Sequence, residues 1–488
     1  MKISTGITDS KKQNRVQALF LLMVTLFIRL PFFTKDYIDR DESTFILMGQ
    51  SIADGHLPYV HLWDLKPPLL FYIFGLIETL FPYTIEAIRL AGVVVVFASA
   101  LVIKKILESG GLNNSFWIAL AFVMLGSEFG NLQGLMSEHL AVFFLLPGLY
   151  LFQQGRMVHY WLAGIFFGAA LLCKLSFAHG LVLMVVAHLV FNWKRQSLTR
   201  HAVNQSLLGI GVLIPFILIA LPYWYQGHIQ LFIDSVFRAP LEYAGAAAMS
   251  MGEKISRTWW VILLALIIIA WAWKRRSRES TELLLYSMAL TAGTVYTFFS
   301  SGIVNGHYLV LIYPFLLMML IGTLPSYQKI RYGWVSLVVV FLSFESLAEY
   351  YKVGKSLVNN GHPYYSNTYV IIDELKKQGL SGEKIFFVDY HIGYWMLKTY
   401  PLTKSTTHPS NIDRAFLFKY FGGKNSGTGE LKYLLDTVRP AVIVSRTPSM
   451  GFIRNEMQTR AYFDSVVANE FEPVYIRQEK QVYVWKRK

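Results

Sequence analysis

Long apolar runs separated by short polar loops occupy the first 350 residues of the chain. A helix that crosses a bilayer needs about 20 predominantly apolar residues. On this criterion eleven segments are predicted to span a membrane: 16–34, 84–103, 115–127, 134–153, 159–175, 177–193, 206–226, 258–273, 282–300, 307–324 and 333–350. A further apolar run at 67–81 is short and bounded by prolines, which indicates a re-entrant or interfacial helix. The pattern therefore predicts an all-α polytopic membrane protein over residues 1–351.

The pattern changes after residue 351, where ordinary soluble sequence begins. Apolar positions at 369–380 have helical spacing, whereas 384–389 and 441–445 are short apolar runs typical of strands. Residues 473–477 and 481–485 are separated by three polar residues and predict a β-hairpin. We expect residues 352–488 to form a small α/β domain.

Composition supports the membrane assignment. The chain is 54% hydrophobic and only 16% charged, against about 25% charged in soluble domains. Its net charge of +14 is the excess of Lys and Arg that membrane proteins place in cytoplasmic loops, so no nucleic-acid partner is implied. The single cysteine, Cys173, excludes a disulfide within the chain. The N-terminal apolar run lacks a small-residue cleavage site and is expected to be a retained signal anchor.

Charge also predicts the orientation. Lys and Arg concentrate in alternate loops, and placing these inside the cell puts the N-terminus in the cytoplasm. The loop 35–83 and the domain 352–488 are then both extracytoplasmic.

The loop 39–74 carries more chemistry than a connection between two helices needs. Four carboxylates, Asp39, Asp41, Glu42 and Asp54, lie near its start. The motifs Gly55-His-Leu-Pro-Tyr59 and Trp63-Asp-Leu-Lys66-Pro-Pro68 follow. We interpret this stretch as an active-site loop at a membrane surface.

Other ionisable groups are predicted on the same external side. Glu138, Lys174 and the pair His307-Tyr308 lie at external ends of predicted spans, and Arg238 lies in an external loop. Each has a structural alternative: Glu138 could be a helix-dipole partner, Lys174 could extend to the interface, and His307 could be a core histidine. Their gathering on one side beside the loop 39–74 favours a functional site.

These residue types suit group transfer from an anionic leaving group. A carboxylate can act as the general base for an acceptor hydroxyl, and lysines can bind a phosphate. No Walker or dinucleotide motif is present, so a lipid-phosphate sugar is the donor class that fits an external membrane site. The reaction would be displacement at an anomeric carbon. No cofactor is required by the pattern, although Asp39 and Asp41 could bind a divalent ion.

The motifs of the first loop also carry a family resemblance. Asp39-Arg-Asp-Glu42, Gly55-His-Leu-Pro-Tyr59 and Trp63-Asp-Leu-Lys-Pro-Pro68 resemble the first external loop of membrane glycosyltransferases of the C-type fold. Protein O-mannosyltransferases and the bacterial transferases that add aminoarabinose to lipid A are the most similar groups. Leu135-Met-Ser-Glu138, Ala170-Leu-Leu-Cys-Lys174 and the segment from His307 to Pro314 are similar to later landmarks in the same order.

The resemblance implies roles for individual residues. Asp41 of the Asp41-Glu42 pair would be the catalytic carboxylate, and Glu138 a second acid on the acceptor side. Lys66 would bind the lipid phosphate with help from Lys174. The lipid A transferases carry an arginine two residues after the Asp-Glu pair, where this chain has Thr44.

The resulting hypothesis is an inverting glycosyltransferase of the bacterial inner (plasma) membrane. It would move a sugar from a polyprenyl-phosphate donor within membrane lipid to a hydroxyl or phosphate of a protein, lipid or glycan acceptor. One alternative is a transporter or flippase of lipid-linked sugars, which would need functional charge deep in several spans. Another is a non-catalytic membrane scaffold, for which Asp41 would be dispensable. A ligase or polymerase of surface polysaccharide is a neighbouring possibility within the enzyme class.

Overall fold

The computed structural model describes residues 3–128, 132–245, 250–276, 280–300, 306–320, 331–421, 426–451, 453 and 457–488. The chain divides into two compact units. Unit 1 comprises Met1–Phe33, Arg89–Ile219 and Ala244–Tyr351, and unit 2 comprises Thr34–Ile88, Ala220–Tyr243 and Lys352–Lys488. The unit that contains the C-terminal residues therefore also includes the predicted first loop.

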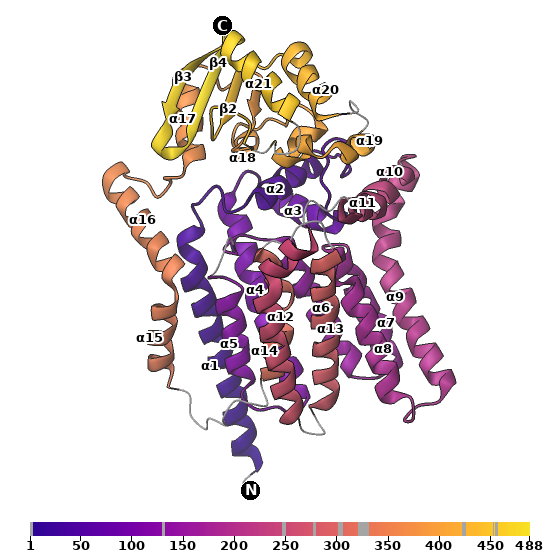
Figure 1. The fold of residues 1–488 in the computed structure, drawn as a ribbon. Helices are drawn as coiled ribbons and strands as arrows, with labels where there is room; N and C mark the ends of the chain where they lie inside the picture. The colour runs from indigo at the N-terminus through magenta and orange to yellow at the C-terminus, as the bar shows by residue number, and fades with distance from the viewer. Residues whose placement is uncertain are drawn as a thin grey trace. The chain divides into compact units, whose positions relative to one another are not determined.

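Unit 1 is a helical bundle. Its main helices are α1 (Ile3–Arg29), α5 (Ser115–Leu125), α6 (Ser137–Gln153), α7 (Met157–Leu171), α8 (Ala178–Asn192), α12 (Met251–Lys274), α13 (Thr281–Ser300), α14 (Tyr313–Leu320) and α15 (Tyr332–Leu342). Most of α4 (Ile85–Ser109), most of α9 (Leu198–Tyr225) and the first half of α16 (Phe344–Asn360) also belong to it. Helices α8 and α13 lie side by side (Figure 1). A Cβ atom on Gly293 would lie 2.3 Å from the Gly180 backbone nitrogen. Glycine at both positions therefore lets the two helix backbones approach closely, as small residues do in membrane helix bundles.

Six helices in the described residues are long and apolar enough to cross a membrane, or seven if the bent pair α15 and α16 is one span. This supports a multi-pass membrane protein, whereas the described residues do not confirm the expected number of eleven spans. Helix α5 has 11 residues and would extend about 17 Å, well short of a hydrocarbon core about 30 Å thick. Helices α6 and α7 are also short, with 17 and 15 residues. Within the predicted span 307–324, residues 321–324 lie outside the described residues.

The predicted span 333–350 is interrupted in the structure. Helix α15 ends at Leu342, and α16 begins at Phe344 with a bend of 74°. The apolar run 67–81 forms α3 (Pro68–Leu80), whose 13 residues are fewer than a span needs. Pro68 occupies the first turn of α3, where its missing N–H costs no helical hydrogen bond.

Unit 2 begins with a helical hairpin made by α2 (Arg40–Ala53) and α3. Gly49 lets the two helices approach closely, since a Cβ atom at this position would lie only 2.8 Å from the Phe74 backbone. The Phe45 and Phe74 rings meet edge to face with their centroids 5.7 Å apart. This hairpin carries the start of α2 and the loop 54–67 that follows it.

The C-terminal part of unit 2 contains a four-stranded sheet in the order β1-β2-β4-β3 (Figure 1). Its strands are β1 (Ile385–Phe387), β2 (Val442–Ser445), β3 (Phe471–Arg477) and β4 (Val482–Arg487). Strands β1 and β2 are parallel, and β4 pairs antiparallel with both β2 and β3. The predicted small C-terminal sheet is therefore present, including the hairpin.

Two helices pack beside this sheet. Helix α17 (Asn367–Lys377) packs near β4, and α21 (Met457–Glu470) packs against β3. Strand residues Phe386 and Ile443 share a buried core with Phe463 and Val467 of α21. Between β1 and β2 lie α18 (Ile392–Met396), α19 (Phe418–Phe421), α20 (Gly427–Lys432) and several single turns. These turns include residues 404–413, which contact the start of α2.

Candidate functional site

Asp41 lies in the first turn of α2. The residue before the helix, Asp39, accepts a hydrogen bond from the Asp41 backbone N–H at 2.9 Å and so caps the helix. Carboxylates are favoured at this end because unpaired N–H groups and the helix dipole stabilise negative charge. Glu42 follows Asp41 and is fully buried. The local sequence thus places Asp41 on a rigid element, with Asp39 serving as the cap.

Lys66 pairs with Asp41. Its Nζ lies 2.8 Å from Asp41 Oδ2, and the two side chains are 19% and 21% exposed. The Tyr59 hydroxyl donates to the Lys66 carbonyl at 2.7 Å, and the Lys66 N–H donates to Asp64 at 3.3 Å. Tyr59 is fully buried with a left-handed φ of 69°, a conformation that a large side chain adopts only where packing holds it. The motif around Lys66 is therefore a fixed loop whose lysine reaches the carboxylate.

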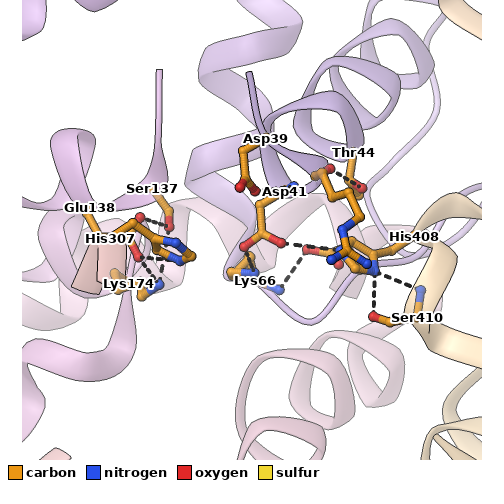
Figure 2. A network of polar contacts seen from close by, with 12 residues as sticks. Asp39, Asp41, Thr44, Lys66, Ser137, Glu138, Lys174, His307, His408 and Ser410 are labelled. Carbon is orange, nitrogen blue, oxygen red and sulfur yellow. Dashed lines mark hydrogen bonds and ion pairs between the residues drawn. The ribbon is translucent and has the colours of Figure 1, made fainter. Parts of the chain in front are cut away.

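His408 is the second partner of Asp41 and comes from the C-terminal part of unit 2 (Figure 2). Its Nε2 lies 3.2 Å from Asp41 Oδ1. Its Nδ1 accepts the Ser410 backbone N–H at 3.2 Å and lies 2.8 Å from the Ser410 hydroxyl. A nitrogen that accepts an N–H carries no proton, so this geometry assigns His408 as neutral, with Nε2–H donating to Asp41.

A second histidine supports the same helix end. His391 is fully buried, and its Nε2 lies 3.1 Å from the Arg40 carbonyl and 3.0 Å from Thr44 Oγ1. Burial, followed by the nearby His408, holds the pKa of His391 well below its usual value, so the ring is neutral. Thr44 of α2 thus contacts a histidine that the C-terminal part of unit 2 supplies.

The arrangement also bears on a metal. Among the described residues no group of three or more His, Cys, Asp or Glu side chains could hold a metal ion. Asp39 is engaged in capping, and the two oxygens of Asp41 face a lysine and an imidazole N–H. These donors occupy the positions that a cation would need.

A separate ionic group lies within unit 1. The Glu138 carboxylate in the first turn of α6 forms an ion pair with Lys174 Nζ, and it accepts from the Ser137 hydroxyl at 2.9 Å (Figure 2). His307 Nε2 lies 3.8 Å from Glu138, and the Lys174 ammonium lies 4.4 Å from the centre of the Tyr308 ring. Four predicted residues, Glu138, Lys174, His307 and Tyr308, thus meet in one cluster.

Two further buried polar side chains, His139 and Arg29, bond to the backbone that precedes α6. His139 Nε2 lies 2.9 Å from the Gly126 carbonyl, and Arg29 donates to the Leu132 carbonyl at 2.9 Å. Arg29 and His139 are nearly fully buried. These contacts fix the backbone that leads into α6, which places Glu138 firmly.

The predicted residues therefore form two groups, each inside one unit. Asp39, Asp41, Glu42 and Lys66 belong to unit 2, whereas the Glu138 cluster belongs to unit 1. Arg238 joins neither set of contacts: its side chain is 61% exposed, and it pairs with Asp234 at 2.8 Å, one helical turn away.

Sequence reasoning missed His408, His391 and Ser410. For His408 and Ser410 the sequence signal is a polar stretch, Thr406-Thr407-His408-Pro409-Ser410-Asn411, inside an otherwise ordinary soluble segment, and His391 lies outside that stretch. Spacing along the chain could not connect His408 to Asp41, which lies 367 residues earlier. The contact exists only because residues 404–413 fold onto the start of α2.

Comparison with known proteins adds no relative from which a role could be transferred. No protein-family model matches the sequence, and no curated protein is significantly similar to it.

Proposed function

We propose that this protein is an integral membrane glycosyltransferase that moves a sugar from a polyprenyl-phosphate donor to an acceptor hydroxyl or phosphate, with inversion. The observation that carries the proposal is the position of Asp41. Its carboxylate lies at a helix N-terminus between a lysine ammonium and a neutral histidine N–H. It keeps about a fifth of its side-chain surface exposed, so a substrate can reach it.

The proposed reaction is a single displacement. The acceptor oxygen forms a bond to the anomeric carbon, and the bond from that carbon to the phosphate oxygen breaks. Asp41 takes the acceptor proton, and the polyprenyl phosphate leaves with the bonding electron pair. The charge that develops on the phosphate needs a cation, and Lys66 is the ammonium adjacent to the base. In the absence of donor, the same lysine neutralises Asp41.

Glu138 and Lys174 fit a supporting role within this proposal. The Glu138 side chain is 1% exposed, and its contacts with Lys174 and Ser137 satisfy both oxygens. Removing a proton from an acceptor would require direct access to the carboxylate. This burial favours a role in shaping unit 1 over proton transfer by Glu138.

The proposed setting is a bacterial inner membrane with the N-terminus in the cytoplasm. The long apolar helices support insertion, and the loop charges support this orientation. Unit 2, with Asp41, Lys66 and His408, would then work on the extracytoplasmic face, where a lipid-linked sugar is the available activated donor.

The test is transfer from a panel of radiolabelled polyprenyl-phosphate sugars to membrane extracts, with wild type and Asp41→Asn compared. We expect Asp41→Asn to lower turnover by about 10²- to 10⁴-fold, the usual contribution of a general base, while donor binding persists. Asp373→Asn, an exposed acid on α17, is the matched control and should transfer normally.

Two outcomes would contradict the proposal. Normal turnover by Asp41→Asn would remove Asp41 as the base. An absence of transfer from every donor, together with donor movement across proteoliposome bilayers, would favour a flippase.

A further inference from the structure

Residues 404–413 of unit 2 contact both the start of α2 and the loop that follows this helix. Thr407 accepts the Trp63 backbone N–H through its Oγ1 at 3.4 Å, and His408 contacts Asp41. His391, from just after β1, contacts Thr44 and the Arg40 carbonyl. His391, Thr407 and His408 are all buried. The residues after 351 therefore reach the carboxylate itself as well as its surroundings.

We propose that His408 is a positioning residue for Asp41, so that the C-terminal part of the chain completes the site. This inference rests on the proposed function, since it assigns Asp41 a role in turnover. It concerns a residue for which the family resemblance, limited to the region before residue 351, supplies no counterpart.

The two oxygens of the Asp41 carboxylate have different partners. Oδ2 faces Lys66, and Oδ1 faces His408. When Lys66 turns to a donor phosphate, its hold on Oδ2 weakens, and the His408 N–H remains as a contact that orients the plane of the carboxylate. Errors of about 1 Å in the placement of a reacting group can cost about 100-fold in rate, so this remaining contact matters.

Ser410 makes the histidine a directional donor. Because Nδ1 accepts the Ser410 N–H, the proton of the neutral ring is confined to Nε2, where it points at Asp41. The same bond caps the turn Pro409–Asp413. His408 therefore has two separable tasks: donation to Asp41 through Nε2, and capping through Nδ1.

Two substitutions separate these tasks. In His408→Asn the amide oxygen can replace Nδ1 as the cap of Ser410, but the side chain is too short to reach Asp41. In His408→Gln the amide nitrogen can replace Nε2 as the donor to Asp41, while the cap is lost. The exposed histidine His362 supplies matched controls, His362→Asn and His362→Gln.

The measurements are kcat and KM for donor transfer, with the apparent melting temperature of each purified variant. We expect His408→Asn to lose about 10- to 100-fold in kcat with little change in KM or melting temperature. We expect His408→Gln to keep most of kcat and to melt at a lower temperature. The His362 variants should match wild type in all three.

The outcomes distinguish the inference from the function it rests on. A wild-type kcat in His408→Asn would overturn the positioning role. So would losses of kcat and of melting temperature that are the same in His408→Asn as in His408→Gln. In either case transfer by the wild type would still uphold the proposed function. No transfer by wild type, with any donor, would overturn both.

Discussion

The two ionic groups of this protein, each inside its own unit, place a carboxylate beside a lysine in opposite environments. Asp41 and Lys66 in unit 2 keep 21% and 19% of their side-chain surface exposed. Glu138 and Lys174 in unit 1 keep 1% and 7%. The partners differ as well, since Asp41 also receives a neutral histidine N–H, whereas Glu138 lies near His307 and Ser137.

This difference indicates which pair can exchange partners. An ion pair with access to water can open when a substrate offers a competing charge, because each separated ion is then solvated. A buried pair has no such replacement, and separating it leaves an uncompensated charge. We therefore expect different roles for these similar pairs: Asp41 and Lys66 would be accessible to a substrate, and Glu138 and Lys174 would stabilise the bundle of unit 1.

The largest expected effect is on the stability of unit 1. Lys174→Met leaves the Glu138 carboxylate buried beside an apolar side chain, and we expect a destabilisation of about 3–5 kcal/mol. Adding Glu138→Gln to this variant removes the unpaired buried charge, so the melting temperature in detergent should return most of the way to the wild-type value. If Lys174→Met melts like wild type, the pair is not the structural element that its burial indicates.

The next effect concerns donor binding in unit 2. Lys66→Ala should weaken binding of a polyprenyl-phosphate donor by about 10- to 100-fold, since a hydrogen bond to a charged group contributes about 1.5–3 kcal/mol. Its melting temperature should change little, because the pair with Asp41 is part-exposed. Donor affinity would be measured by titration of labelled lipid.

Arg238→Ala is the matched control for this measurement. Arg238 is an exposed cation that pairs with Asp234 within the same short segment. Its removal should leave donor affinity at the wild-type value. Unchanged affinity in both variants would remove Lys66 from the phosphate site.

The smallest effect is a pH dependence of stability from His391. Its pKa is depressed by burial, so the folded state binds no proton there while the unfolded chain is protonated below about pH 6.5. Its stabilising contribution is therefore complete above that pH and is lost as pH falls toward the folded pKa, by up to about 1.4 kcal/mol per pH unit.

The check is to compare melting between about pH 7.5 and 5.5 in wild type and His391→Gln. The glutamine keeps a donor for the Arg40 carbonyl but cannot titrate, so the acid-induced loss should be smaller in this variant. Parallel pH profiles of the two proteins would show that His391 is not held neutral by its burial.

Much of the architecture could be predicted because it follows from local chemistry. Runs such as 84–103 must form helices long enough for a bilayer, since apolar surface and unpaired backbone groups leave few alternatives. The alternating residues near the C-terminus predict the β3–β4 hairpin for the same reason. The number of spans was less predictable, because hydropathy does not show where a helix such as α5 ends or where Ser343 separates α15 from α16.

The candidate residues divide in the same way. Asp41, Lys66, Glu138 and Lys174 could be selected from sequence, because charge in or beside apolar segments is costly and needs a reason. The tertiary structure alone decided their partners and exposure. His408 contacts Asp41 because a segment distant in sequence folds against the start of α2. The Glu138 pair is buried, whereas the Asp41 pair is partly exposed. The amino-acid sequence determines which ionisable groups are present, whereas tertiary packing determines which of these groups water and substrate can reach.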